Sequence, residues 1–289
     1  MDKMSGVRIG TCSWKYESWR GIVYPEDGEF DFLREYARHF DTVEVDQWFW
    51  SLGDRDQVML PRPADVSRYR QAVLAGFRFS VKASNSVTLT HHYRKDKAAP
   101  LRANPHFLSP ELYDDFLKSL QGLGEKLGLV MLQFEYLNKQ KMAIQDEFLK
   151  KLDNFASRCP RHIPLAVELR NPAWLNEAYF TFLRDHGLHH VFCQGYYMPP
   201  VWEIDDTFGD RLTDTAIIRL MGRDRPGMEA KSGDHWDRVL EPKDNELEKI
   251  IAMVRRQVKR KKTVYINVNN HYEGSAPLTA GKIVALLRE

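Results

Sequence analysis

Four charged residues near the ends of short apolar runs could carry acid–base chemistry. Glu44 lies in the run TVEVD, Lys82 in FRFSVKA, and Glu168 and Arg170 in PLAVELR. A carboxyl group can act as acid or base, depending on how burial and neighbouring charges shift its pKa. An amine can stabilise an oxyanion or a phosphate, or form a Schiff base when it is desolvated. We therefore predict that Glu44, Lys82, Glu168 and Arg170 are catalytic, with Glu168 kept ionised by the nearby Arg170.

The alternation of side chains along a strand explains why these charges would converge. Successive residues point to opposite faces of a strand. In PLAVELR the apolar set Leu165, Val167 and Leu169 should pack on helices, so that Glu168 and Arg170 face the other way. The same rule turns a larger polar set inward: Glu44, Asp46, Ser80, Lys82, Gln133, Arg219, Asn267 and Asn269. Burying these charges costs several kcal/mol unless opposite signs are paired. A purely structural network of ion pairs is therefore the alternative interpretation.

Eight short apolar runs, separated by loops and amphipathic stretches, must position these residues. The runs are Val7–Ser13, Thr42–Trp48, Phe77–Ala83, Gly128–Phe134, Pro164–Arg170, His189–Gln194, Thr215–Met221 and Thr263–Asn269. Strands that alternate with helices indicate βαβ units and a parallel sheet. Eight such units in 289 residues predict an α/β fold, a (β/α)8 TIM-type barrel, with a single domain over residues 1–289. A doubly wound open sheet is the alternative.

The signals at helix ends agree with this alternation. Ser109, followed by Pro110 and Glu111, is typical of a helix N-terminus. Gly187 follows EAYFTFLRDH and is a plausible C-cap, and a last helix is expected over Thr279–Arg288. The basic segment Arg255–Lys262 could bind phosphates, but we favour a solvated helix C-terminus, where the helix dipole stabilises positive charge.

Composition and charge exclude several classes of protein. With 43% hydrophobic and 28% charged residues, the chain has the composition of a soluble globular protein. A net charge of +2 gives no strong field for nucleic acid or a membrane. The three cysteines are far apart, which fits neither a zinc knuckle nor a disulfide framework and indicates a reducing compartment. MDKMSGVRIG has no apolar signal core, so we predict a cytoplasmic protein without a membrane partner.

The sequence favours chemistry without a cofactor. No glycine-rich phosphate loop follows the first apolar run, so we expect no redox cofactor. A divalent metal held by Glu44, Asp46, Glu168, His91 and His271 is the alternative. Three positive side chains at the same mouth and the lack of an HExxH or HxH spacing argue against it. We therefore predict no metal, and expect His91 to lie in a loop that binds an anion or is simply solvated.

Six motifs occur in a fixed order along the chain. They are IGTCSWKYESWRGIVYP, YARHFDTVEVDQWFW, GFRFSVKAS, LGEKLGLVMLQF, LAVELRNPAW and NVNNHYEG. Together they resemble the motifs of the DUF72 (YecE-like) family over nearly the whole chain. The resemblance implies a TIM-type barrel, and it implies no particular reaction because the family has no established activity. It also implies a set of site residues: Trp14, Glu44, Lys82, Gln133, Glu168, Arg170, Asn269 and Asn270.

The chain departs from the family pattern around the expected mouth of the barrel. The segment Asp46–Trp50 stands where the family usually has Asn, small hydroxyl residues and Phe-Tyr, and Phe134–Tyr136 replaces Leu-Pro-Pro. His271 stands where the family usually has Asp. The mouth should therefore be more aromatic and differently charged. Trp14 and Trp50, with Trp48, could stack on a sugar or base, or could pack in the core.

The candidate binding residues surround the catalytic four with hydrogen-bonding, charged and aromatic groups: Trp14, Asp46, His91, Gln133, Arg219, Asn269, Asn270 and His271. They favour an enzyme that hydrolyses or isomerises a small polar or anionic, hydroxyl-bearing metabolite such as a sugar, sugar phosphate or nucleoside. A nucleic-acid-binding or processing barrel is one alternative, suggested by a pI near 8.3 and the basic segments Arg94–Lys97 and Arg255–Lys262. A ligand-binding barrel without catalysis is the other.

Overall fold

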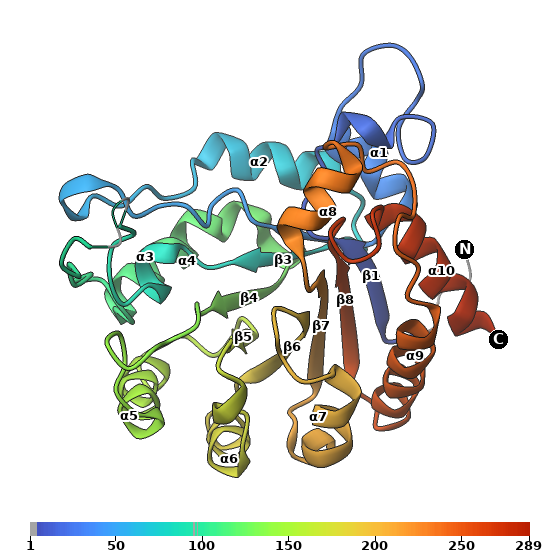
Figure 1. Cartoon of the computed structure of the whole chain (residues 1–289). Coiled ribbons are helices and arrows are strands. Elements are labelled where there is room, and N and C mark those ends of the chain that lie inside the picture. The colour runs from blue at the N-terminus through green and yellow to red at the C-terminus, as the bar shows by residue number, and fades with distance from the viewer. Residues whose placement is uncertain (1–4, 95, 97) are drawn as a thin grey trace.

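Eight parallel strands form a barrel surrounded by helices (Figure 1). The computed structural model describes residues 5–94, 96 and 98–289. The strands run in the order β1-β8-β7-β6-β5-β4-β3-β2, so each one lies beside its neighbours in the sequence. They are β1 Val7–Thr11, β2 Thr42–Val45, β3 Arg78–Lys82, β4 Leu127–Gln133, β5 Leu165–Glu168, β6 His189–Gly195, β7 Thr215–Gly222 and β8 Thr263–Val268. The predicted (β/α)8 barrel and its eight strands are confirmed.

The barrel closes between β1 and β2, where the contact is thinner than elsewhere. An isolated parallel bridge joins Cys12 to Glu44, just beyond the end of β1. Deeper in the seam the phenol of Tyr36 takes the place of a backbone hydrogen bond. Its oxygen accepts from the backbone N of Thr11 at 2.8 Å and donates to the carbonyl O of Thr42 at 3.0 Å. A buried side chain from the first helix therefore joins the two edge strands and nearly completes the barrel.

The helices cover the outside of the sheet (Figure 1). They are α1 Phe32–His39, α2 Pro63–Ala72, α3 Asn85–Thr88, α4 Pro110–Leu120, α5 Gln145–Ala156, α6 Glu177–His186, α7 Val201–Phe208, α8 Arg225–Ser232, α9 Asp244–Lys259 and α10 Ala276–Arg288. The predicted caps are confirmed: Ser109 Oγ accepts from the backbone N of Leu112, and Gly187 ends α6 with φ +65°. The predicted start of the last helix at Thr279 was wrong, because Pro277 allows the first turn to begin at Ala276.

Two apolar layers confirm the alternation expected from the sequence. The predicted outward residues, such as Val43, Val81, Val167 and Val264, belong to the large core between sheet and helices. A smaller apolar cluster is formed by the residues that point into the barrel: Leu129, Met131, Ala166, Val191, Ile217 and Tyr265. This inner layer fills the barrel below the polar residues, so the polar groups gather toward the carboxyl ends of the strands.

Six of the eight strands are shorter at their carboxyl ends than the sequence predicted, whereas β6 and β7 are one residue longer. β2 ends at Val45, β5 at Glu168 and β8 at Val268. Asp46, Arg170 and Asn269 therefore lie in the loops that follow these strands and not in the ladder itself. Residues in loops can turn their side chains more freely, so alternation alone does not fix where these three groups point.

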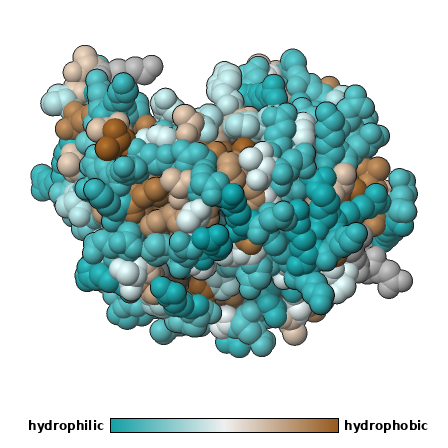
Figure 2. Space-filling view, turned by 90° about the horizontal axis from the view of Figure 1, so that it is seen from below, coloured by the Kyte–Doolittle hydropathy of each residue, from teal (hydrophilic) through white to brown (hydrophobic). Residues whose placement is uncertain are grey.

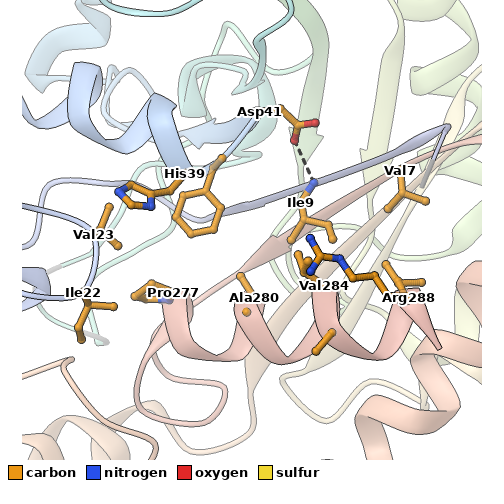
Figure 3. Close-up of a pocket in the computed structure, with 14 residues that line it drawn as sticks. Val7, Ile9, Ile22, Val23, His39, Asp41, Pro277, Ala280, Val284 and Arg288 are labelled. Carbon is orange, nitrogen blue, oxygen red and sulfur yellow. Dashed lines mark hydrogen bonds between the residues drawn. The ribbon is translucent and has the colours of Figure 1, made fainter. Parts of the chain in front are cut away.

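The face seen from below is mostly hydrophilic, with hydrophobic residues gathered in a few recesses (Figure 2). The apolar pocket drawn in Figure 3, of about 320 Å³, lies over the outer face of β1, between α10 and the end of α1. Val7 and Ile9 form its floor, and Pro277, Ala280 and Val284 form one wall. Within the described residues, no helix has both the length and the apolar character needed to cross a membrane.

Candidate functional site

Arg219 of β7 lies at the centre of the polar mouth. The residue is 1% exposed, and carboxylates contact its guanidinium group from two sides. Nε and Nη2 donate to the two carboxylate oxygens of Glu44, each at 2.7 Å, and Nη1 donates to Glu168 Oε2 and, at 3.1 Å, to Gln133 Oε1. Burial alone would lower the pKa of Arg219, but Glu168 and Glu44 raise it well above its usual value. Arg219 therefore stays charged and holds three strands together across the barrel.

Glu168 of β5 has a second cationic partner. Its Oε1 accepts from Nε of Arg170 at 2.8 Å, while its Oε2 accepts from Arg219. Burial would raise the pKa of Glu168, but Arg219 and Arg170 outweigh this effect and lower the pKa from 4.5 to about 2. Glu168 is therefore held as a carboxylate, as the sequence predicted. We call Glu44, Arg219, Glu168 and Arg170 the ion-pair cluster.

Lys82, the last residue of β3, differs from every member of the ion-pair cluster. It is only 9% exposed, yet it makes no ion pair or hydrogen bond with a residue that the structure describes. Its Nζ instead lies over the ring of Phe49, 4.2 Å from the ring centre. Burial and then repulsion from Arg219 lower the pKa of Lys82, although Glu44, Asp46 and Glu168 act in the opposite direction. A buried amine without a partner is a costly feature and is typical of functional sites.

Asp46 follows β2 and lies close enough to Lys82 for their charges to interact. Glu44 of β2 pairs in register with Ser80 of β3, so that two residues further on Asp46 and Lys82 extend neighbouring strands. Burial and then repulsion from Glu44 raise the pKa of Asp46. The pKa shifts of Asp46 and Lys82 both favour the neutral form and bring the two pKa values closer together.

Sulfur-containing side chains line the mouth beside the charges, and sequence analysis missed them. Cys12, Cys193, Met198 and Met221 form one buried cluster, in which the Sγ of Cys12 is 3.9 Å from the Sδ of Met221. Cys12 Sγ also lies 3.6 Å from Glu44 Oε2. Burial and then the charge of Glu44 raise the pKa of Cys12 well above its usual value, so it is a protonated thiol. Cysteine and methionine resemble other apolar residues in sequence, so the pattern gave no signal.

The three predicted tryptophans occupy different places. Trp14 is 3% exposed and packs edge-on against Tyr69, and Trp48 stacks on the same ring at 5.3 Å. These two tryptophans therefore pack against the core. Trp50 is 62% exposed and touches Tyr93, with 5.4 Å between the ring centres. Of the three, Trp50 is the one whose ring a ligand could contact without any rearrangement of the protein.

Four polar residues lie at the end of β8, and their side chains have different surroundings. Asn267 is fully buried on the inner face, and the structure describes no hydrogen-bond partner for its amide. Asn269 accepts at Oδ1 from the backbone N of His271 at 2.9 Å, and its Oδ1 also meets the His271 ring. Asn270 accepts at Oδ1 from the backbone N of Ala276, so its amide oxygen fixes the start of α10 and is not free to bind a ligand.

His271 and His91 lie outside the ion-pair cluster. His271 Nε2 is 3.2 Å from Glu229 of α8, and its ring packs against Trp236. His91 Nδ1 is 2.9 Å from Thr90 Oγ1. Burial is the main cause that lowers the pKa of both histidines, followed by Arg225 for His271 and Lys141 for His91. Among the residues described, no three His, Cys, Asp or Glu side chains come together as metal ligands would.

Two glycines let the loops after β6 and β7 approach each other at the mouth. Gly222 has φ +78°, and a Cβ there would lie 2.2 Å from the carbonyl O of His271. Gly195 has φ +138°, and a Cβ there would lie 2.2 Å from the carbonyl O of Gly222. Only glycine fits these positions. They bring the ends of β6, β7 and β8 together beside Arg219.

Several cations of the predicted basic segments bind groups of the protein itself. Arg256 binds Asp205 and Asp206, and Arg260 binds Asp210. The Nζ of Lys262 donates to two backbone carbonyl groups. In the other segment, Arg94 donates to the carbonyl O of Ala99, whereas Lys95 and Lys97 lie outside the described residues. The tail of α9 is therefore a paired helix C-terminus.

Comparisons with known proteins agree on one family. The family model described as "Protein of unknown function DUF72" matches residues 8–289. The UPF0759 protein YecE of Escherichia coli K12 is 26% identical over 183 residues, which are 63% of this chain and 55% of that protein. The chain thus spans about half the length of the curated relatives it matches.

Solved structures give the same result for the fold. A DUF72 family protein from Thermotoga maritima MSB8 is 25% identical, with a TM-score of 0.69 over 98% of this chain and 99% of that chain. One from Enterococcus faecalis V583, 19% identical, also has a TM-score of 0.69, over 98% and 96% of the two chains. The expected resemblance is therefore confirmed: this chain belongs to the DUF72 family, whose function is unknown.

Proposed function

We propose that the mouth of the barrel is the active site of an enzyme that acts by acid–base chemistry, without a redox cofactor, on a small polar or anionic, hydroxyl-bearing metabolite. A sugar, a sugar phosphate or a nucleoside has the required groups. The observation that carries the proposal is Lys82. A buried amine without an ion-pair partner among the described residues destabilises the fold, and a functional role explains why it is there.

The ion-pair cluster supports this role by fixing the field around the amine. Glu44 and Glu168 already accept hydrogen bonds from Arg219 and Arg170, so they are poor candidates for transferring a proton. They are better suited to hold Arg219 rigid and to set the potential at Lys82. Preorganised charges of this kind stabilise charge that develops in a transition state. In this proposal Glu44, Glu168 and Arg219 position the site, and Arg170 donates hydrogen bonds to a substrate oxygen.

Lys82 and Asp46 are the groups that exchange protons. The pKa of Lys82 is lowered and that of Asp46 is raised, in each case mainly by burial. A neutral amine can remove a proton from a hydroxyl-bearing carbon or from water, and a protonated carboxyl can return one to a leaving oxygen. Both hydrolysis and isomerisation use this pair of steps. This is also the reason to prefer an enzyme over a barrel that only binds its ligand.

A substrate screen with matched variants tests the proposal. Wild-type protein would be incubated with sugars, sugar phosphates and nucleosides, and turnover would be followed by NMR. Lys82→Met and Asp46→Asn should each reduce the rate of any turnover found by about 10²-fold or more, the usual contribution of a positioned acid or base. Lys150→Met, on the exposed face of α5, serves as the control and should leave the rate unchanged. Turnover that survives both Lys82→Met and Asp46→Asn would refute the proposal.

A further inference from the structure

An exposed pair of aromatic rings lies beside the proposed active site. Trp50, in the loop after β2, is 62% exposed, and Tyr93, in the loop after α3, is 57% exposed. Their ring centres are 5.4 Å apart, with the planes inclined by 45°. We call these two rings the aromatic ledge. Large rings are usually buried because they remove much apolar area from water, so two exposed rings in contact call for a partner.

A continuous series of contacts links the aromatic ledge to Lys82. Phe49, which is buried, supports the Trp50 ring edge-on at 5.2 Å and an interplanar angle of 80°. The other neighbour of Phe49 is Lys82, whose Nζ lies 4.2 Å from the ring centre. One side chain therefore separates the exposed Trp50 ring from the amine. A ligand that lies on Trp50 would therefore be close to the proposed reacting groups.

The polar groups around the aromatic ledge suit hydroxyl groups better than phosphates. Tyr93 lies within electrostatic range of Glu135 and Arg170. Glu135 Oε2 accepts from Lys141 at 2.6 Å, whereas its Oε1 is buried without a described hydrogen-bond partner. An unpartnered acceptor of this kind is costly, and a small rotation of the carboxylate would let a ligand hydroxyl satisfy it. A phosphate would instead be repelled by Glu135.

Three described cations in this part of the mouth already have carboxylate partners. Lys141 binds Glu135, Arg170 binds Glu168, and Arg102 binds Asp56. Single-stranded nucleic acids also stack on aromatic rings, but they need a positive groove that follows the backbone. These three cations, each paired with a carboxylate, do not supply such a groove. Aromatic faces combined with hydroxyl-binding acceptors are the chemistry that recognises a saccharide.

We propose that Trp50 and Tyr93 form a stacking subsite that holds a sugar ring of a saccharide substrate beside Lys82. This inference rests on the proposed function, because it places the ring next to the reacting groups, and it narrows the substrate class to carbohydrates. The apolar face of the sugar ring would lie on Trp50, and its hydroxyl edge would face Glu135. Trp50 and Tyr93 are binding residues in this scheme and take no part in proton transfer.

Titration of saccharides into ledge variants tests the stacking subsite. The probes are cello-, malto-, xylo- and chito-oligosaccharides, with a single-stranded oligothymidine for comparison, and binding is measured by calorimetry. Wild-type protein should bind at least one of the saccharides. Trp50→Ala should weaken that binding roughly tenfold, and Tyr93→Ala roughly fivefold. Trp50→Phe should keep most of the affinity. Leu74→Ala removes an exposed apolar side chain elsewhere and should change nothing.

The outcomes separate the subsite from the proposed reaction. Binding that depends on Trp50, but with no turnover that depends on Lys82, supports the subsite and contradicts the proposed enzyme. Turnover that depends on Lys82, with the same KM in wild-type and Trp50→Ala, supports the enzyme and contradicts the subsite. Binding of oligothymidine but of none of the saccharides overturns the subsite as a carbohydrate site and favours nucleic acid. Because both rings are exposed, we expect the variants to melt at the wild-type temperature.

Discussion

The ion-pair cluster and Lys82 are neighbours in the same mouth. The charges of the cluster have hydrogen-bonded partners, whereas the charge of Lys82 has none among the described residues. In the cluster each described charge has a partner at hydrogen-bond distance, and Arg219 uses Nε and both Nη atoms. Lys82 is almost as deeply buried, but it has no ion pair or hydrogen bond among the described residues, and its Nζ lies 4.2 Å from the centre of the Phe49 ring. The comparison teaches that burial alone does not mark a reacting group. What distinguishes Lys82 is burial without a partner.

The difference also separates stability from activity. A buried ion pair contributes little net stability compared with apolar packing, but removing one partner leaves a charge that is very costly. A buried charge that never had a partner costs stability from the start, so its removal should stabilise the fold. The two parts of the mouth should therefore respond to mutation with opposite signs, and the three predictions below test this.

The largest effect is expected for Arg219→Met. The substitution keeps most of the side-chain volume but leaves Glu44 and Glu168 buried and without their central partner. We expect the free energy of unfolding to fall by about 3–5 kcal/mol, measured by urea denaturation at pH 7. Arg184→Met is the control, because Arg184 binds Asp185 on the exposed surface and should contribute less than about 1 kcal/mol. Equal losses in the two variants would mean that the ion-pair cluster does not hold the mouth together.

A smaller effect is expected for the pH dependence of stability. The folded-state pKa of Glu168 is about 2, below its usual value of 4.5. Its stabilising contribution is therefore complete above about pH 4.5 and is lost as the pH falls toward 2, because the unfolded chain takes up the proton first. Between pH 6 and pH 3 wild-type protein should lose about 2 kcal/mol through this residue alone.

Glu168→Gln isolates that contribution. Its unfolding free energy should fall by about 2 kcal/mol less than that of wild type between pH 6 and pH 3. Glu248→Gln, an exposed glutamate on α9, should show the wild-type loss. If Glu168→Gln and Glu248→Gln lose stability in parallel, Glu168 is not held ionised by Arg219 and Arg170.

Much of this comparison could be foreseen from the sequence, because strand alternation is a local property. Alternation predicted, without any knowledge of distances, that four charged side chains face one another: Glu44, Lys82, Glu168 and Arg219. It could not show which of them are bonded. Glu44 on β2 and Arg219 on β7 are 175 residues apart and meet across the barrel, so their pairing depends on barrel closure and strand register. The unpartnered state of Lys82 depends on the same global geometry.

The loops were the part that the sequence could not settle. Trp14 and Trp50 belong to one residue type and follow neighbouring strands, yet one is buried against Tyr69 and the other is exposed beside Tyr93. Asn270 looked like a second amide for the site, but its Oδ1 fixes the start of α10. Loop conformation depends on tertiary contacts, and no short-range pattern encodes it.

The smallest effect, and the one with the opposite sign, is expected for Lys82→Met. Methionine is unbranched and only one atom shorter, and it removes the unpartnered charge, so the free energy of unfolding at pH 7 should stay the same or rise by about 1 kcal/mol. Lys262→Met is the matched comparison. Lys262 is another buried lysine, and burial followed by repulsion from Arg260 lowers its pKa to about 8. Its Nζ, however, donates to the carbonyl O atoms of Gly209 and Leu212.

Lys262→Met should therefore destabilise by about 1–3 kcal/mol, because it leaves two buried carbonyl groups without donors. The pH dependence gives an independent check. The folded-state pKa of Lys82 is lowered, so its ammonium destabilises the fold below that pKa, and the penalty disappears as the pH rises and the amine loses its proton. The gain in Lys82→Met should thus shrink between pH 7 and pH 10. A loss of stability in Lys82→Met as large as that in Lys262→Met would show that Lys82 has a structural partner, and the distinction between the two parts of the mouth would then be wrong.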